Sequence, residues 1–85
     1  MIKQNDILMY KEPLEEGDES RIMIALEDET EETGVSMVRV QHINSGFVLR
    51  PVEFFEAGYY KVIGKVLPND TVDSIVARYK HLIKD

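Results

Sequence analysis

The two histidines are the side chains best suited to acid–base or metal chemistry. His42 follows a strand-like run, and His81 lies near the end of a helical pattern. Neither has the HExxH spacing of a zinc site, and the chain has no cysteine to complete one. We therefore interpret both as surface residues. A His–carboxylate metal pair would need the fold to bring His42 to the acidic segment 27–32, and we expect these two places at opposite ends of one strand.

Segment 27–32, Glu-Asp-Glu-Thr-Glu-Glu, is the most acidic part of the chain and offers oxygen ligands for a hard cation. Calcium loops place their oxygens at alternate positions and sharpen the turn with a glycine, and this run lacks that order. A solvated hairpin tip is the main interpretation. Weak cation binding, and an acidic face that imitates nucleic acid or docks on a basic partner, stay open as alternatives.

Nucleophilic and phosphate-binding motifs are missing from the sequence. Ser45 lies in Asn-Ser-Gly rather than in the G-x-S-x-G elbow of hydrolases. The five glycines are dispersed as turn residues and do not form a phosphate loop. The sequence therefore predicts that the protein is not an enzyme, and it indicates no catalytic residue, cofactor or metal.

Aromatic side chains gather in one segment, with Phe54, Phe55, Tyr59 and Tyr60 close together. In an extended chain each doublet puts one ring on each face, so we expect at least one of the two tyrosines to be exposed. Basic residues lie nearby, which makes this the one place where bases could stack beside positive charge. The main interpretation of these rings is core and core rim. The functional alternative is an exposed patch that binds a peptide, a base or a second copy of the domain. That partner-binding surface would be formed by Arg50, Phe54, Phe55, Tyr59, Tyr60, Lys61 and Lys65.

Composition and charge narrow the class of protein further. The chain has 85 residues, 44% of them hydrophobic, which suits one globular domain. The lack of cysteine, of a signal-peptide core and of any run near ~20 apolar residues favours a cytoplasmic protein with no membrane span. The net charge is −6, and residues 1–42 hold 11 acidic and 4 basic residues. This acidic N-terminal half of the chain repels phosphate and anionic lipid, which disfavours nucleic acid and membranes as partners.

Short apolar runs separated by glycine and polar turns predict a mainly β domain. Ile22, Ile24 and Leu26 alternate with Met23 and Ala25, so this strand is expected to be covered on both faces. It should form a hairpin with the next run, across the acidic segment. The predicted strands are 7–10, 21–26, 35–43, 47–49 and 59–67.

Two further features of the sequence concern the second half of the β region. Segment 52–58 could form a helical turn that ends at Gly58 or the edge of a strand, and we favour the turn. Gly64 lies inside an apolar strand-like run, which indicates a bulge or a close approach of another part of the chain.

The closing segment predicts an amphipathic helix from about residue 71 to 83. Asp70 or Thr71 can cap its first turn. Apolar residues then recur at helical spacing, and basic residues lie near the end, where they suit the helix dipole. So short a helix must pack on the sheet of its own chain or on a second subunit, and the latter would give a homodimer.

The runs "DILMYKEP", "RIMIALEDETEETGVSMVRV" and "GYYKVIGKV" together resemble the Src-homology-3-like small barrels over residues 6–67. The chain also resembles small bacterial proteins of unknown function. The resemblance to the barrels implies a four- to five-stranded, antiparallel, partly open barrel. Peptide-binding members of that class carry a tryptophan-containing groove, and this chain has no tryptophan, so no set of binding residues is carried over.

Taken together, these patterns predict one domain over residues 1–85, with a β barrel over 6–67 and a C-terminal helix over 70–84. The predicted function is that of a small acidic interaction or accessory module. It would bind a protein through the aromatic–basic surface or through the helix. A nucleic-acid-associated regulator, or an acidic mimic of nucleic acid, is the alternative.

Overall fold

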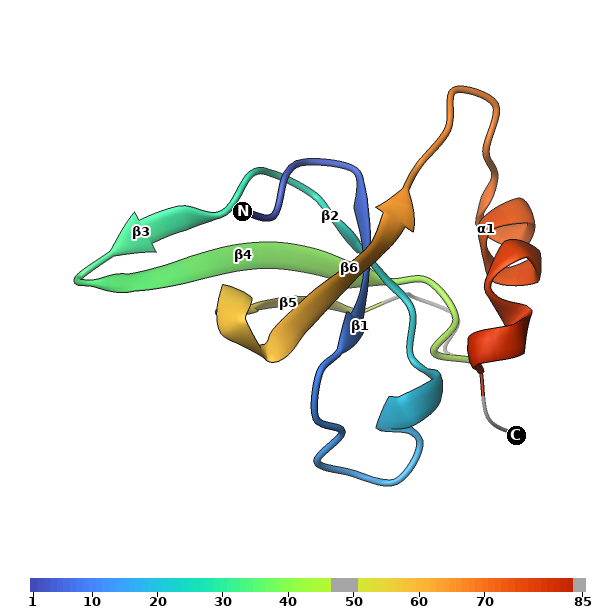
Figure 1. Ribbon diagram of the computed structural model, residues 1–85, viewed down its shortest axis with the longest axis horizontal. Coiled ribbons are helices and arrows are strands. Elements are labelled where there is room, and N and C mark those ends of the chain that lie inside the picture. Colours follow the sequence, from blue (N-terminus) through green and yellow to red (C-terminus); the bar gives the residue numbers. More distant parts are fainter. Residues whose placement is uncertain (47–50, 84–85) are drawn as a thin grey trace.

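The computed structural model describes residues 1–46 and 51–83. This part of the chain forms six β-strands and one short α-helix (Figure 1). The elements are β1 (Asp6–Tyr10), β2 (Met23–Ala25), β3 (Thr30–Glu32), β4 (Val35–His42), β5 (Val52–Glu56), β6 (Tyr60–Lys65) and α1 (Val72–Arg78).

All strand pairs of the sheet are antiparallel, and the order is β3-β4-β2-β1-β6, with β5 paired to β4 as well. β4 is the longest strand and pairs with three others, β2, β3 and β5. β2 and β3 follow one another along one edge of β4, whereas β5 pairs with its other edge. The β3–β4 hairpin extends away from the rest of the molecule (Figure 1).

The predicted mainly β fold with a closing helix is confirmed, but the sheet is not closed into a barrel and has six strands rather than four or five. In the described residues, β6 pairs only with β1 and β5 only with β4, so no ladder joins the two ends. Two of the six strands were not predicted: β3 lies in the predicted tip of the hairpin, and β5 lies in segment 52–58. The amide of Glu29 donates to the carbonyl of Ile2 instead of β4, which separates β2 from β3.

The preferred helical turn over 52–58 is wrong for residues 52–56, which form strand β5. Extended pairing with β4 gives hydrogen-bond partners to the backbone groups along one edge of β5, whereas an isolated helical turn leaves most of its groups unpaired. A single 3-10 turn does follow, at Ala57–Tyr59, and leads into β6. The predicted strand 47–49 lies outside the described residues.

Apolar side chains alternate between the two faces of the sheet, as predicted for the strand around Met23. One face buries Leu8, Met23 and Val40 together with Tyr60. The other face is covered by α1 and buries four isoleucines, of which Ile75 comes from the helix: Ile7, Ile22, Ile43 and Ile75.

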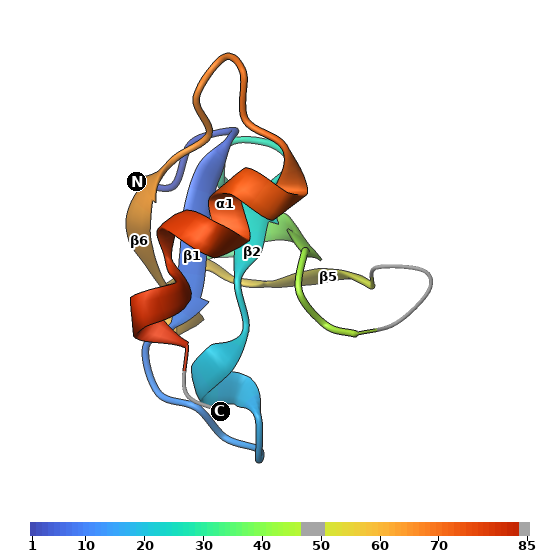
Figure 2. The same cartoon turned by 90° about the vertical axis from the view of Figure 1, so that its right-hand side faces the viewer.

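Helix α1 lies over β1 and β2 (Figure 2). Ile75 is only 2% exposed within the single chain. Ile75 therefore packs the helix on its own sheet, whereas Leu82 of the predicted apolar stripe stays 39% exposed.

Gly64 shows both features that the sequence indicates. The register of β1 and β6 runs from Ile7 opposite Gly64 to Leu8 opposite Val62, so Ile63 is the extra residue of a bulge. A Cβ atom on Gly64 would lie 1.8 Å from the hydroxyl of Tyr79. The absence of a side chain at residue 64 lets the aromatic ring at the end of α1 rest directly on the β6 backbone.

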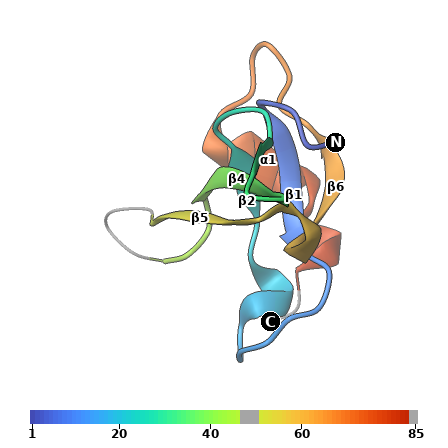
Figure 3. The ribbon, with the colours of Figure 1, turned by 90° about the vertical axis from the view of Figure 1, so that its left-hand side faces the viewer.

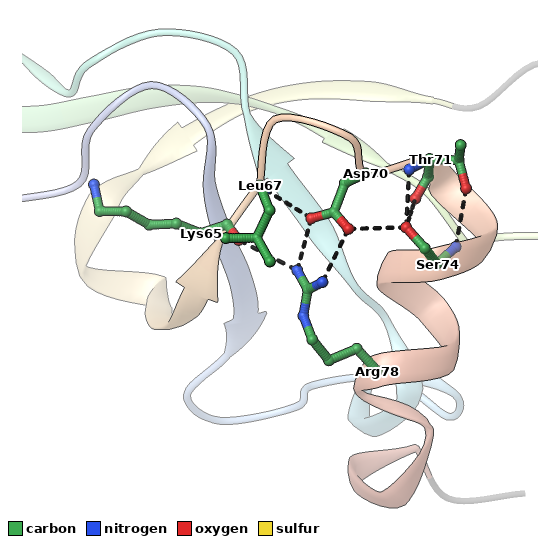
Figure 4. Close-up of polar contacts among 6 residues, drawn as sticks. All are labelled: Lys65, Leu67, Asp70, Thr71, Ser74 and Arg78. Carbon is green, nitrogen blue, oxygen red and sulfur yellow. Dashed lines mark hydrogen bonds and ion pairs between the residues drawn. The ribbon is translucent and has the colours of Figure 1, made fainter.

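The start of α1 is fixed by a capping box, as the sequence indicated for Asp70 or Thr71. The amide of Ser74 donates to Thr71 Oγ1 at 3.1 Å, and the amide of Thr71 donates to Ser74 Oγ at 2.8 Å (Figure 4). The helix is shorter than predicted: the α-helical part ends at Arg78, and residues 80–82 form a 3-10 turn.

Asp70 joins the helix to the loop before it (Figure 4). Its carboxylate accepts both terminal nitrogens of Arg78 at 2.9 Å and the amide of Leu67 at 2.7 Å. Arg78 also donates to the carbonyl of Lys65, the last residue of β6. The bidentate bond to Arg78, ahead of the Leu67 amide, holds the pKa of Asp70 far below its usual range.

This pKa shift makes an acid-sensitive contribution to stability that Asp70→Asn should remove. Because the folded-state pKa is depressed, the contribution is complete above the unfolded pKa near ~4 and is lost as pH falls below it. We therefore expect urea midpoints of the wild type to fall more steeply below pH ~4 than those of Asp70→Asn. Asp73→Asn, which removes an exposed carboxylate from the same helix, should keep the wild-type slope. Parallel slopes for the wild type and Asp70→Asn would contradict this assignment.

Candidate functional site

Four polar side chains from four strands meet on the face of the sheet opposite α1. The carboxylate of Glu53 on β5 accepts the hydroxyl of Tyr10 at 2.9 Å and also that of Tyr60. Nε2 of His42 lies 3.3 Å from the other oxygen of Glu53. The rings of Tyr10 and Tyr60 stack with centroids 5.6 Å apart. Glu53 thus joins β1, β4 and β6 to β5.

The interpretation of His42 as a surface residue is wrong, because the residue is 8% exposed and belongs to this cluster. The reason is register: in β4 the buried positions are Val38, Val40 and His42, so His42 points to the same face as the two valines. The β4–β5 pairing puts Glu53 opposite Val40, on that same face. His81, in contrast, is exposed.

Both tyrosines of the cluster hold their protons strongly. Burial, followed by the hydrogen bond and the negative charge of Glu53, raises the pKa of Tyr10 and of Tyr60 well above the ordinary value. The two hydroxyls are therefore fixed as donors to Glu53. Neither is poised to act as a base near neutral pH.

A cleft of about 280 Å³ opens beside this cluster. Its wall and rim combine acidic and aromatic side chains, and we call it the acidic–aromatic cleft. The described lining residues are Tyr10, Glu12, Leu14, Glu15, Asp18, Glu53, Phe55 and Tyr59. None of them is a lysine or an arginine, so the described lining carries four carboxylates without a cationic side chain among them.

One wall of the cleft is an edge-to-face aromatic pair. Glu53 and Phe55 are two residues apart on β5 and so share a face, and Tyr59 follows in the 3-10 turn. This turn comes directly after β5 in the ribbon (Figure 3). The rings of Phe55 and Tyr59 are 4.7 Å apart at 80°. They remain 44% and 40% exposed, which leaves two large ring surfaces open to solvent beside the cleft.

Another part of the lining comes from the loop between β1 and β2, which contributes Glu12, Leu14, Glu15 and Asp18. Asp18 orders this loop, because its carboxylate accepts the amides of Leu14 and Glu15 at 3.2 and 3.0 Å. The positive charge of Arg21 is near enough to lower the pKa of Tyr10 against the larger effects that raise it. The guanidinium donates to the carbonyl of Ser45, however, and Arg21 does not line the cleft. These hydrogen bonds hold the acidic loop in a defined conformation beside the cleft.

The structure separates the predicted aromatic–basic surface into several environments. Phe55 and Tyr59 line the acidic–aromatic cleft, whereas Phe54 lies on the other face of β5 beneath the guanidinium of Arg39. Tyr60 is 2% exposed, so only Tyr59 of the doublet is available to a partner, as the alternation predicted.

The basic members of that surface are also apart. Lys65 places its ammonium 3.1 Å from the carboxylate of Asp6, a residue that is 3% exposed. Lys61 is exposed on β6, and Arg50 lies outside the described residues. Among the described members, then, Phe55, Tyr59 and Tyr60 lie beside carboxylates, whereas Phe54 lies beneath Arg39.

The acidic segment 27–32 is more than a solvated tip. Asp28 and Glu29 bind the N-terminal segment, since they accept the amides of Gln4 and Ile2. Glu29 is half-buried, whereas Glu27, Asp28 and the β3 residues that follow are exposed. Within residues 1–46 and 51–83 no group of three or more histidine, aspartate or glutamate side chains is arranged to hold a metal ion.

Comparison of the chain with protein-family models, with curated proteins and with solved structures finds no match. Nor does any helix in the described residues have the length and apolar character needed to cross a membrane. The resemblance to small Src-homology-3-like barrels therefore stays a sequence-based prediction, and any functional argument must come from the cleft itself.

Proposed function

We propose that this chain is a non-catalytic protein-interaction module, and that it binds a segment of another polypeptide in the acidic–aromatic cleft. The exposed pair Phe55 and Tyr59 beside a hollow is the observation that carries this proposal. Large exposed rings next to a cleft are characteristic of recognition sites, where aromatic side chains supply most of the contact area.

A binding role suits the polar cluster better than a catalytic one. Glu53 already accepts two hydroxyl donors, and His42 lies beside its second oxygen. A carboxylate that is engaged in this way is a poor general base, and tyrosines with raised pKa values are poor nucleophiles. The cluster supports the cleft mechanically, because it fixes β5 against β1 and β6.

The cleft is also a better candidate than the other surfaces considered from the sequence. The apolar stripe of α1 already contacts its own sheet, where Ile75 is buried, so less of that stripe is open to a partner. Phosphate groups would be repelled by four carboxylates in the cleft, and the ammonium of Lys65 is already paired with Asp6. A protein partner is therefore favoured over nucleic acid.

Selection of a random peptide display library on the immobilised domain tests this function. We expect the wild type to enrich related sequences, and Phe55→Ala and Tyr59→Ala to lose that enrichment because they remove the ring surfaces. Val62→Ala is the matched control, since Val62 is 48% exposed on β6 but does not line the cleft. Circular dichroism of each variant checks that it is folded. The proposal fails if no sequence family is enriched, or if folded Tyr59→Ala enriches the same family.

A further inference from the structure

We infer that the acidic–aromatic cleft takes the guanidinium group of an arginine side chain presented by a basic polypeptide. This inference rests on the proposed protein-binding function and specifies the chemistry of its ligand. Four described carboxylates and three aromatic rings line one hollow whose size suits a single long side chain. A cationic group with a flat face matches both components at once.

Charge complementarity is the first argument. Glu12, Glu15 and Asp18 come from one loop and Glu53 comes from β5, and all four residues line the same cleft. Carboxylates gathered around one hollow focus negative potential inside it. A cation that enters the cleft relieves the repulsion among these carboxylates, whereas an anionic or purely apolar ligand does not.

The second argument is that the chain already uses the proposed arrangement twice within its own fold. Arg39 lies 5.1 Å over the ring of Phe54 and 3.6 Å from the carboxylate of Glu27. Arg78 lies 5.2 Å over the ring of Tyr79 while it binds both oxygens of Asp70. The cleft presents a third set of rings and carboxylates, and no described lining residue supplies the arginine.

The third argument distinguishes arginine from lysine. A guanidinium group is planar, so it can lie against the exposed ring of Tyr59 or Phe55 while its edge donates to carboxylates on the rim. An ammonium group is compact and strongly hydrated, and it gains less from a ring and a bidentate acceptor together. Both rings line the cleft and stay partly exposed, so ring surface is open to a flat cation there.

Titration of the nitrogen-15-labelled domain with three peptides tests the inference. The peptides share a Gly-Ser sequence and differ at the central pair of residues, which are arginine, lysine or the uncharged arginine analogue citrulline. We expect the arginine peptide to shift the amide signals of residues 53–59 and to bind about tenfold or more tightly than the citrulline peptide. The lysine peptide should bind at least about threefold more weakly than the arginine peptide. Added salt should weaken the binding of both peptides.

A pair of charge-matched variants shows whether the cleft is the site. Glu12→Gln with Glu15→Gln removes two carboxylates from the rim, and Glu31→Gln with Glu32→Gln removes two exposed carboxylates from β3. Both double variants change the net charge equally. The arginine peptide should bind about tenfold more weakly to the first and nearly normally to the second.

The other occupants of the cleft would give different results, and each would overturn the inference. Equal affinity for the citrulline peptide would mean that the cation is not recognised, although display-selected peptides that depend on Tyr59 would leave the proposed function standing. Equal weakening in both double variants would indicate net charge alone. Signal shifts at residues 53–59 with calcium alone, or with rising protein concentration alone, would indicate a metal ion or a second copy of the chain.

Discussion

Gly64→Ala should lower the free energy of unfolding by about 2–3 kcal/mol, because the new methyl group would occupy the place of the Tyr79 hydroxyl. The same Cβ would also lie 3.0 Å from the ring carbon that carries this hydroxyl, so turning the hydroxyl alone cannot relieve the clash. The ring must move, and it belongs to the apolar cluster that holds α1 on the sheet. For a domain of this size the loss corresponds to roughly 10–20 °C in melting temperature, measurable by circular dichroism.

Two controls isolate this mechanism. Gly58→Ala adds the same methyl group where nothing lies within 4 Å, so we expect its melting temperature to stay close to that of the wild type. In a Tyr79→Ala background the clash is gone, and Gly64→Ala should then cost little further stability. A wild-type melting temperature for Gly64→Ala would contradict the close packing of α1 on β6.

Glu53→Leu is the second change with a large expected effect. It removes the acceptor of the Tyr10 and Tyr60 hydroxyls, and a buried donor without a partner costs about 1–3 kcal/mol. We expect a loss of about 2–4 kcal/mol in urea unfolding, since Tyr60 is fully enclosed and Tyr10 partly so. Glu56→Leu replaces an exposed glutamate on the same strand and should change stability by less than ~0.5 kcal/mol. Equal effects of the two substitutions would contradict the role of Glu53.

The same cluster makes a prediction for alkaline pH. Because the folded-state pKa of Tyr10 and Tyr60 is raised, their contribution to stability is complete below pH ~10, the usual tyrosine value, and is lost as pH rises above it. In Glu53→Gln both pKa values should fall toward the ordinary value. Ultraviolet absorbance of tyrosinate during a pH titration should then rise at lower pH than in the wild type. Superimposable titration curves would show that Glu53 does not hold these protons.

Local pattern was sufficient to predict much of the fold. The double-sided apolar alternation around Met23, the hairpin before β4 and the capped helix after Asp70 each depend on neighbours within a few residues, and all three are present. The role of Gly64 was also predictable from its neighbours, because a glycine inside an apolar strand often marks a bulge or a close backbone approach. The strand at 52–56 was not predictable in this way, since its pairing with β4 is decided by residues ten or more positions earlier.

The candidate site was only half predictable, for the same reason. Phe55 and Tyr59 were visible as part of an aromatic segment, and the alternation correctly predicted one exposed tyrosine. The partners that give the site its character come from distant strands: Tyr10 on β1 and His42 on β4 meet Glu53 only through the sheet register. Sequence neighbours placed lysines beside the rings, whereas in the described fold it is the acidic loop between β1 and β2 that reaches them.

The most direct measurement of the central claim is the intermolecular nuclear Overhauser effect between the arginine peptide and the domain. If the guanidinium lies in the acidic–aromatic cleft, the Hδ protons of the arginine should show contacts to the ring protons of Phe55 and Tyr59. The Tyr59→Ala variant should lose these contacts and retain its folded spectrum. Contacts from a saturating peptide to another face of the domain, or none to either ring, would contradict the claim.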